Sequence, residues 1–551
     1  MRFCLLTPLT ALLLGSLLSQ VAFGQTLERV TLDSAGAQAN DSSRWADVSA
    51  DGRFIVFASV ASNLVPGDTN NAEDIFVRDR RTGTTERVSV DSSGIQGNST
   101  SRRSSISEDG RYVGFVSYAT DLVPGDTNNA LDAFVHDRNT GATIRISVDS
   151  SGNQGNGPCR EAPVSFSADS RFAAFTSAAS DLVPGDTNGA PDSFVYELAT
   201  GQVTRISVSS SGVEGNAGGE RPALSGDGRY VAFDSSSSDL VSGDFNSQFD
   251  IFVHDRQTGT TIRASLDSSG GEGFGPSFIP SISSDGQLVA FQSSASSLVT
   301  GDTNGSYDAF VRDLSSGTTT RVSVDSSGIE GDSHSRIARI SGDGRFVSFE
   351  SSATNLVPSD TNGVDDILVH DLSDSSTTRL SLDESGQEAA LECALADLSS
   401  GGRFVVFETR AALVADDTND RTDIYVIDRL RLQLDGTPQG GSNTSFTLSQ
   451  AYGHADNKMQ VLISCTGTAP GFPIPGGQWV PLVPDACLTL SLDLQPLLSA
   501  TIDATEAATT LTVPFPAAPP GLVIHAAALI IELLPTPRFV GVSAPLSITT
   551  Q

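Results

Sequence analysis

Residues 63–94 read NLVPGDTNNAEDIFVRDRRTGTTERVSVDSSG, and this stretch decides the fold. Its Gly-Asp-Thr-Asn string, or a close variant, recurs with the Asp at positions 68, 126, 186, 244, 302, 360 and 417, at intervals of 57 to 60 residues. A second string, Arg followed by an aliphatic residue and Ser or Thr, recurs with the Arg at positions 29, 87, 145, 205, 263, 321 and 379. Two independent markers therefore agree on seven units of one repeat.

Each unit contains four short strand signals separated by turn residues, as the first unit illustrates. An inner strand leads into the turn Asp51-Gly52 and a second strand at 53–58. After a longer loop come a third strand at 74–79, the turn Thr82-Gly83 and a fourth strand at 85–90. No stretch shows a sustained helical period. Four-strand repeats are typical of propeller blades, so the sequence predicts an all-β chain with a seven-bladed β-propeller.

The seventh unit lacks a fourth strand, and a matching segment lies at the other end of the repeat region. Residues 27–33, Leu-Glu-Arg-Val-Thr-Leu-Asp, match the fourth strands of other units, such as residues 86–91. We therefore expect the N-terminal segment to be the outermost strand of blade seven. Such a strand would close the ring and cover an otherwise open sheet edge.

The propeller repeats account for residues 25–430, and the sequence changes character on either side. Residues 1–24 have the features of a secretory signal peptide, with a mainly apolar run before a small-residue site at 22–24. Residues 431–442 are expected to be a linker, and residues 443–551 a small β-sandwich-like module. Cys465 and Cys487 in this module are predicted to form a disulfide, while Cys159 and Cys393 are predicted to be separate buried thiols.

The charge balance limits the possible partners. The chain has 66 acidic residues against 33 Lys and Arg, giving a formal charge of −33. This charge excludes nucleic acid as a partner. No segment after the signal offers about 18 uninterrupted apolar residues, so we expect a mature chain without a transmembrane segment. We expect it to be secreted or periplasmic, with a monomeric propeller and a protein or glycan partner in the cell envelope or outside the cell.

Two stretches carry a resemblance to a known family. Residues 49–57, Ser-Ala-Asp-Gly-Arg-Phe-Ile-Val-Phe, and 341–349, Ser-Gly-Asp-Gly-Arg-Phe-Val-Ser-Phe, resemble the repeats of TolB-like, WD-like β-propellers. The resemblance covers about residues 26–430, with departures at the turn residues Ser170, Gln287 and Gly401. It implies a propeller used mainly as a binding or scaffolding platform in exported bacterial proteins. It implies no particular reaction.

The loop between the second and third strands contains Asp-x-Asn-x-x-x-Asp in every unit. Oxygen ligands at alternate positions followed by a carboxylate suit Ca²⁺, so these residues are candidate metal ligands. The alternative is a plain turn in which the last Asp caps the third strand. Propeller connectivity would place these acidic loops on the long-loop face, around the mouth of the central channel. The candidate ligands are Asp68, Asn70, Asp74, Asp126, Asn128, Asp132, Asp186, Asn188, Asp192, Asp244, Asn246, Asp250, Asp302, Asn304, Asp308, Asp360, Asn362, Asp366, Asp417, Asn419 and Asp423.

Two further repeated positions are polar. The repeated Arg of the fourth strand is predicted to form cross-strand ion pairs with the acidic residues that end the third strands. These acidic residues are Asp79, Asp137, Glu197, Asp255, Asp313, Asp371 and Asp428. His136, His254 and His370 share one third-strand position and are predicted to lie on a solvated rim rather than to bind a metal.

The sequence offers little support for catalysis. It contains no Gly-x-Ser-x-Gly elbow, no His-Glu-x-x-His pair and no phosphate-binding loop, and we assign no catalytic residue. We therefore expect a non-catalytic binding or scaffolding propeller that engages protein or glycan through its acidic long-loop face, with calcium as a candidate stabilising ion. Two alternatives stay open. One is a propeller enzyme, a lyase or hydrolase, with a cation-assisted carboxylate site at the channel mouth, and the other is a structural cell-surface protein.

Overall fold

The computed structural model describes residues 26–429 and, beyond them, the backbone of seven strands between residues 432 and 548. The chain divides into two compact units, Met1–Leu430 and Arg431–Gln551. No helix among the described residues has the length and apolar character needed to cross a membrane. The described part of the first unit consists of strands, turns and loops.

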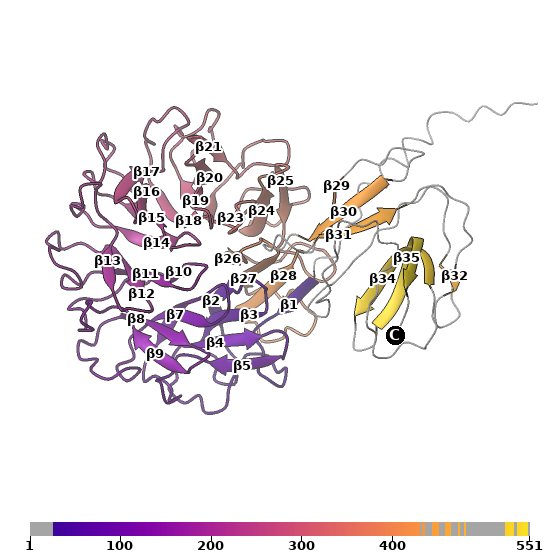
Figure 1. The fold of residues 1–551 in the computed structure, drawn as a ribbon, viewed down its shortest axis with the longest axis horizontal. Helices are drawn as coiled ribbons and strands as arrows, with labels where there is room; N and C mark the ends of the chain where they lie inside the picture. Colours follow the sequence, from indigo (N-terminus) through magenta and orange to yellow (C-terminus); the bar gives the residue numbers. More distant parts are fainter. Residues whose placement is uncertain are drawn as a thin grey trace, which may run out of the picture. The chain divides into compact units, whose positions relative to one another are not determined.

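The first unit is a seven-bladed β-propeller, as the sequence predicts, and each blade is a four-stranded antiparallel sheet (Figure 1). Blade 1 contains β2 (Ser43–Val48), β3 (Phe54–Ser59), β4 (Asp74–Asp79) and β5 (Thr84–Arg87). Blade 2 contains β6 (Ser101–Ile106), β7 (Tyr112–Ser117), β8 (Asp132–Asp137) and β9 (Ala142–Arg145). Blade 3 contains β10 (Ser165–Phe166), β11 (Phe172–Ser177), β12 (Asp192–Glu197) and β13 (Val203–Arg205). Blade 4 contains β14 (Glu220–Leu224), β15 (Tyr230–Ser235), β16 (Asp250–Asp255) and β17 (Thr260–Arg263).

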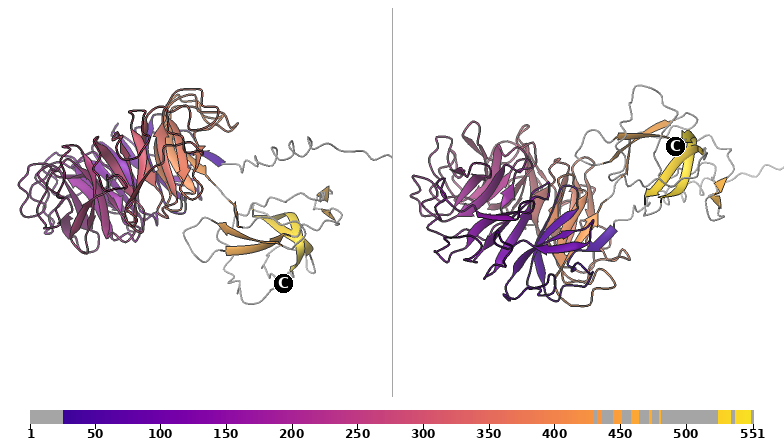
Figure 2. Two further views of the ribbon diagram at one scale, coloured as in Figure 1. Left: turned by 90° about the horizontal axis from the view of Figure 1, so that it is seen from above. Right: turned by 60° about the horizontal axis from the view of Figure 1, so that its bottom comes forward.

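The remaining three blades continue the ring, which the views of Figure 2 show from other sides. Blade 5 contains β18 (Ser277–Ile282), β19 (Leu288–Ser293), β20 (Asp308–Asp313) and β21 (Thr318–Arg321). Blade 6 contains β22 (Ser335–Ile340), β23 (Phe346–Ser351), β24 (Asp366–Asp371) and β25 (Ser376–Arg379). Blade 7 contains β26 (Cys393–Leu398), β27 (Phe404–Thr409), β28 (Asp423–Asp428) and β1 (Thr26–Arg29).

The predicted closure of the ring is confirmed. Strand β1 pairs with β28 in antiparallel register, from Thr26 opposite Asp428 to Arg29 opposite Tyr425. The amide of Val30 continues the ladder by donating to the carbonyl of Ile424 at 2.8 Å. The N-terminal strand therefore covers the edge of the last blade.

Apolar side chains fill the space between successive blades. The second and third strands of blade 1 stack Phe57 on Phe76 with ring centroids 5.9 Å apart, and the same pair recurs in blades 2 to 5. Burying each such ring contributes about 1.5–3 kcal/mol to folding. Cys159 and Cys393 are free and buried in these interfaces, as the sequence predicts.

The second unit is described only by its strands. A three-stranded sheet contains β29 (Leu432–Asp435), β30 (Thr444–Gln450) and β31 (Lys458–Ile463), and two-stranded sheets are formed by β32 (Phe472–Pro473) with β33 (Trp479–Val480) and by β34 (Ile524–Leu533) with β35 (Pro537–Ile548). Strand β29 lies in the segment expected to be a linker. The proposed disulfide between Cys465 and Cys487 and the signal peptide at residues 1–24 lie outside the described residues.

Candidate functional site

The Asp-x-Asn-x-x-x-Asp loops are held in place by the repeated arginine of the fourth strand. In blade 1, Nη1 of Arg87 lies 3.6 Å from Asp68 and 3.5 Å from Asp74. The side-chain Nδ2 of Asn70 donates to the carbonyl of Gly97 at 2.9 Å. Its side-chain Oδ1 accepts from the backbone amide of Ala72 at 2.9 Å. The asparagine therefore forms a turn and ties two long loops together.

The same arrangement recurs around the ring. In blades 2 to 6 the repeated arginine lies within 4 Å of both aspartates of its loop, while in blade 7 Arg29 pairs with Asp416 and Asp417. The side chains of Asp68 and Asp74 are only 5% and 0% exposed. The expectation that these carboxylates surround the channel mouth is therefore wrong, because each pair is buried against the outermost strand of its own blade.

The predicted partners of the repeated arginine are also wrong, although it does form ion pairs. Antiparallel pairing places Arg87 opposite Phe76 and Thr84 opposite Asp79, so the arginine faces the start of the third strand rather than its end. Asp79 instead pairs with Arg53, which directly precedes β3, with Nε to Oδ1 at 3.0 Å and Nη2 to Oδ2 at 2.6 Å. The hydrogen bonds from Arg53 help to hold the pKa of Asp79 at about 2, although its burial acts to raise it.

The three repeated histidines are buried, which corrects the prediction of a solvated rim. Nδ1 of His136 lies 2.9 Å from the hydroxyl of Thr143, which itself donates to the carbonyl of Val90 at 2.5 Å. Because that hydroxyl proton is already used, Nδ1 must be the donor. In blade 1, Arg78 occupies the same position and donates to Thr85 at 3.1 Å. The position therefore requires a buried donor, and burial lowers the pKa of all three histidines.

A glutamine or glutamate from the loop after the fourth strand also contacts each cluster, and it divides the clusters into two types. Three clusters have a glutamine, and in blade 1 Nε2 of Gln96 donates to Asp68 and Asp74, both at 2.9 Å. Four clusters have a glutamate instead, and in blade 3 Glu214 accepts from Nη1 of Arg205 at 2.8 Å. The glutamine type contains Gln38, Gln96 and Gln154, and the glutamate type contains Glu214, Glu272, Glu330 and Glu388. Glutamate-type clusters thus place three carboxylates around one guanidinium.

The blade 3 cluster brings three carboxylates close together. One carboxylate oxygen from each of Asp186, Asp192 and Glu214 lies within 4.8 Å of the others. Burial raises the pKa of Asp192 to about 6, which reflects the cost of charge at this position. Nη1 of Arg205 contacts all three carboxylates, at 3.6, 3.3 and 2.8 Å. A calcium ion would have to displace this guanidinium, and calcium binding stays a prediction.

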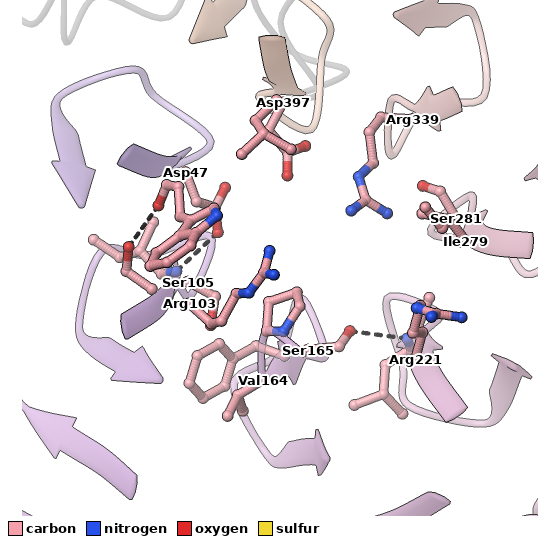
Figure 3. A pocket seen from close by; sticks show the side chains of 18 of the residues that line it. Asp47, Arg103, Ser105, Val164, Ser165, Arg221, Ile279, Ser281, Arg339 and Asp397 are labelled. Carbon is pink, nitrogen blue, oxygen red and sulfur yellow. Dashed lines mark hydrogen bonds between the residues drawn. The ribbon is translucent and has the colours of Figure 1, made fainter. Parts of the chain in front are cut away.

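A second candidate site is a cavity of about 280 Å³ enclosed by the innermost strands of all seven blades, which we call the central channel (Figure 3). Six of these strands contain a β-bulge residue with a left-handed backbone, with φ between 50° and 58°: Trp45, Arg103, Arg221, Ile279, Ile337 and Leu395. Such conformations cost about 1–3 kcal/mol each for non-glycine residues. The surrounding structure must therefore enforce them.

Side chains from the preceding blade hold most of these bulges. The amide of Trp45 donates to Glu408 at 2.9 Å, and the amide of Ile279 donates to Asp234 at 3.0 Å. Glu350, Gln292 and Thr176 accept the equivalent amides of Leu395, Ile337 and Arg221. In blade 3 the equivalent residue is Pro163, which has no amide hydrogen, and the facing residue is the apolar Val116.

Sequence reasoning missed these buried acceptors. The available signal was an acidic residue within an otherwise apolar second strand, since a buried polar side chain requires a partner. Burial raises the pKa of Glu350 and of Glu408 to about 7, and that of Asp234 to about 6.

Charged side chains point into the central channel from four blades. Figure 3 shows Asp47, Arg103, Arg339 and Asp397 directed toward the cavity. Asp47 accepts from the amides of Val48 at 2.7 Å and Ile106 at 2.8 Å. Burial and then the nearby charge of Asp397 raise the pKa of Asp47 well above its usual range. The channel thus combines the guanidinium groups of Arg103 and Arg339 with two carboxyl groups whose pKa values burial raises.

The fold defines a β-propeller protein. Three solved structures show limited similarity to the chain. The β-propeller domain of the Trilobed protease from Pyrococcus furiosus is 11% identical, with a TM-score of 0.44 over 71% of this chain and 94% of that chain. An oligogalacturonate lyase in complex with manganese is 13% identical, with a TM-score of 0.44 over 74% of this chain and 96% of that chain. TolB from Acinetobacter baumannii is 18% identical, with a TM-score of 0.31 over 54% of this chain. The match spans 63% of the TolB chain.

No family model matches the chain, and no curated protein matches it.

Proposed function

We propose that the protein is an exported, non-catalytic binding propeller that engages a protein or glycan partner through its long-loop face. The observation that carries this proposal is a pair of exposed aromatic rings on the long loops of blades 4 and 5. Phe245 is 84% exposed and Phe274 is 79% exposed. Contiguous exposed apolar surface marks binding sites on folded domains, and these two side chains belong to loops that hydrogen bonds join.

Both phenylalanines depart from the repeat. The position of Phe245 is threonine in the other six units, and the position of Phe274 is asparagine in four of them. The loops can form the same turns without aromatic rings, because the other units form them with polar residues at these positions. The substitutions therefore favour a role outside the fold.

The two loops that display the rings are joined to each other. The amide of Phe245 donates to Glu272 at 3.1 Å, and the side chain of Asn246 donates to the carbonyl of Gly273 at 2.9 Å. Phe274 follows directly, and its amide donates to Ser297 at 3.1 Å. The rings are thus presented from a braced backbone, which lowers the entropy lost when a partner binds.

The test uses substitutions that restore what other units contain. Full-length protein and the double variant Phe245→Thr/Phe274→Asn are compared on a glycan array and in pull-downs from the native cell envelope. We expect binding of a shared ligand to fall at least tenfold in the double variant. The matched control is Ile329→Asn, because Ile329 is also exposed on a long loop and Asn153 occupies its position in another unit. Equal binding by all three proteins would refute the proposal.

A second candidate function is the propeller enzyme, favoured by the carboxyl pair Asp47 and Asp397. Two neighbouring carboxyl groups are a common arrangement for a general acid and a general base. Its test is a panel of polysaccharides, with unsaturated products and new reducing ends as readouts for a lyase and a hydrolase. Turnover that Asp47→Asn and Asp397→Asn each abolish would support this function over the first.

A further inference from the structure

We propose that the central channel is a binding site for a small organic monocarboxylate, held between the guanidinium groups of Arg103 and Arg339. This site is separate from the long-loop face, and it rests on different residues. Its ligand would enter a cavity enclosed by the innermost strands rather than dock on the loops.

Arg103 and Arg339 form no ion pair with the described residues, although the guanidinium of Arg103 lies over the ring of Trp45, 4.6 Å from its centroid. Among residues 26–429, no carboxylate lies within 4 Å of either guanidinium, and neither guanidinium has a hydrogen-bond acceptor there. Nε of Arg103 is buried and unsatisfied. By contrast, Arg221 in the same cavity pairs with Asp234 at 2.7 Å.

Most arginines of the described propeller pair with a carboxylate, in a chain with twice as many acidic as basic residues. The repeated arginine before the second strand and the repeated arginine of the fourth strand bind aspartates, as Arg53 and Arg87 do in blade 1. A guanidinium that faces a cavity without an acceptor is a ready partner for an added carboxylate, which it can bind through two parallel hydrogen bonds.

The charge of the cavity favours a monoanion. Arginine stays protonated at neutral pH, so Arg103 and Arg339 supply two positive charges. The acids that share the cavity are Asp47, Asp397 and Glu108, and burial raises the pKa of each. Arg339 also interacts with Asp47 and Asp397, so its positive charge is partly offset and the cavity suits a single anionic group. A doubly charged phosphate would face these acids at a Coulombic cost.

The walls favour a ligand with an apolar body. Trp45, Ile279, Ile337 and Leu395 line the cavity beside the charged groups. The volume of about 280 Å³ is just below the range of about 300–1,000 Å³ that is typical of pockets for drug-sized molecules. A carboxylate attached to one ring or to a short alkyl chain fits this combination.

The backbone holds the two arginines independently of a ligand. Arg103 is itself a bulge residue, and Arg339 follows the bulge residue Ile337 by two positions. Hydrogen bonds between neighbouring blades brace the ring, since Ser281 accepts from the amide of Ile340 at 3.2 Å and Ser165 accepts from the amide of Leu224 at 3.0 Å. The site is therefore formed before binding.

The experiment measures binding of benzoate and hexanoate to the full-length protein by calorimetry, with inorganic phosphate as the competing anion. We expect saturable binding of at least one carboxylate, stronger than that of phosphate. Arg103→Gln and Arg339→Gln should each weaken it at least tenfold. The matched control is Arg336→Gln, because Arg336 lies on the same strand as Arg339 but is exposed. No saturable carboxylate binding, or phosphate binding that exceeds it, would overturn the proposal.

A second measurement uses the unaltered protein and therefore does not require that the arginine variants fold. Phenylglyoxal modifies accessible guanidinium groups, and peptide mapping locates the modified residues. Saturating carboxylate should protect Arg103 and Arg339 at least fivefold while Arg336 reacts as before. Unchanged modification of both channel arginines would refute the site. The variant Phe245→Thr/Phe274→Asn should bind the carboxylate normally, which separates this inference from the proposed function.

Discussion

The carboxylate of Glu408 in blade 7 accepts a hydrogen bond from the backbone amide of Trp45 in blade 1, at 2.9 Å, across the seam where the ring closes. Trp45 has a φ of 53°, so this bond holds a left-handed residue in the wall of the central channel. Glu350, Asp234, Gln292 and Thr176 hold the equivalent residues in other blades.

Removing the acceptor at the seam should destabilise the propeller. At pH 5, Glu408→Leu is expected to lower the free energy of unfolding by about 1–3 kcal/mol, because the amide of Trp45 loses its partner in a buried position. Chemical denaturation with fluorescence detection measures the change. Glu408→Gln is the control, since Gln292 already serves in this role elsewhere in the ring. If the leucine and glutamine variants are equally stable, the hydrogen bond has no measurable role.

The buried glutamates predict how stability depends on pH. Burial raises the pKa of Glu350 and Glu408 to about 7, above the value of 4.5 for a free glutamate. Between these values the folded state binds more protons than the unfolded state, so stability falls as pH rises. We expect the melting temperature to decrease from pH 5 to pH 8. The double variant Glu350→Gln/Glu408→Gln should show a flatter profile, and an unchanged slope would contradict this assignment.

Deleting the closing strand should expose the edge of blade 7. Removal of residues 26–33 is expected to lower stability by several kcal/mol or to cause aggregation, because β28 would lose its outer partner and keep only β27. Calorimetry and light scattering report the two outcomes. Leu27→Asp should also destabilise the chain, since Leu27 packs against the core of blade 7, whereas the exposed Thr26→Asp should not. A deletion variant that melts like the full chain would show that closure contributes little.

The calcium prediction has its sharpest test in blade 3. A cation in that cluster would add charge compensation to three carboxylates that share one arginine, so chelation should lower the melting temperature. Glu214→Gln would convert the cluster to the glutamine type and should reduce the calcium-dependent part of stability, while Gln96→Glu in blade 1 should increase it. Equilibrium dialysis counts the bound ions. A chelator-insensitive melting curve with no bound calcium would leave Arg205 as the cation of the cluster.

The repeat made the architecture predictable, since the same markers return every 57 to 60 residues. It also predicted the closing strand, because residues 27–33 match the fourth strands of other units. The partner of Arg87 was not predictable, because it depends on the register that the turn at Gly83 imposes on β5 against β4. The position of a residue in the repeat does not reveal how deeply its side chain is buried. His136 was therefore expected on a solvated rim, whereas it is buried and hydrogen bonded to Thr143.

The channel was the least predictable part of the molecule. A left-handed backbone at Ile279 contradicts the preference of a β-branched residue, and Asp234 of the preceding blade stabilises it by accepting a hydrogen bond from its amide. The charged groups that meet at the axis come from blades that are far apart in the sequence. No local sequence pattern predicts that Arg103 and Arg339 line the same cavity.

The closing strand also sets an order of events for folding. Thr31 is hydrogen bonded to Asp423, 392 residues further along the chain, whereas the other strands of each blade pair with close neighbours in sequence. Such a long-range contact is slow to form, because a large loop must close before it is gained. Each of blades 1 to 6 is built from four strands that are consecutive in the sequence, so it can form as soon as that segment has been synthesised. Blade 7 combines β1 with β26, β27 and β28, so it cannot be completed until residue 428 is available. Ring closure is therefore the last step of assembly, and a chain interrupted before that residue would remain an open arc.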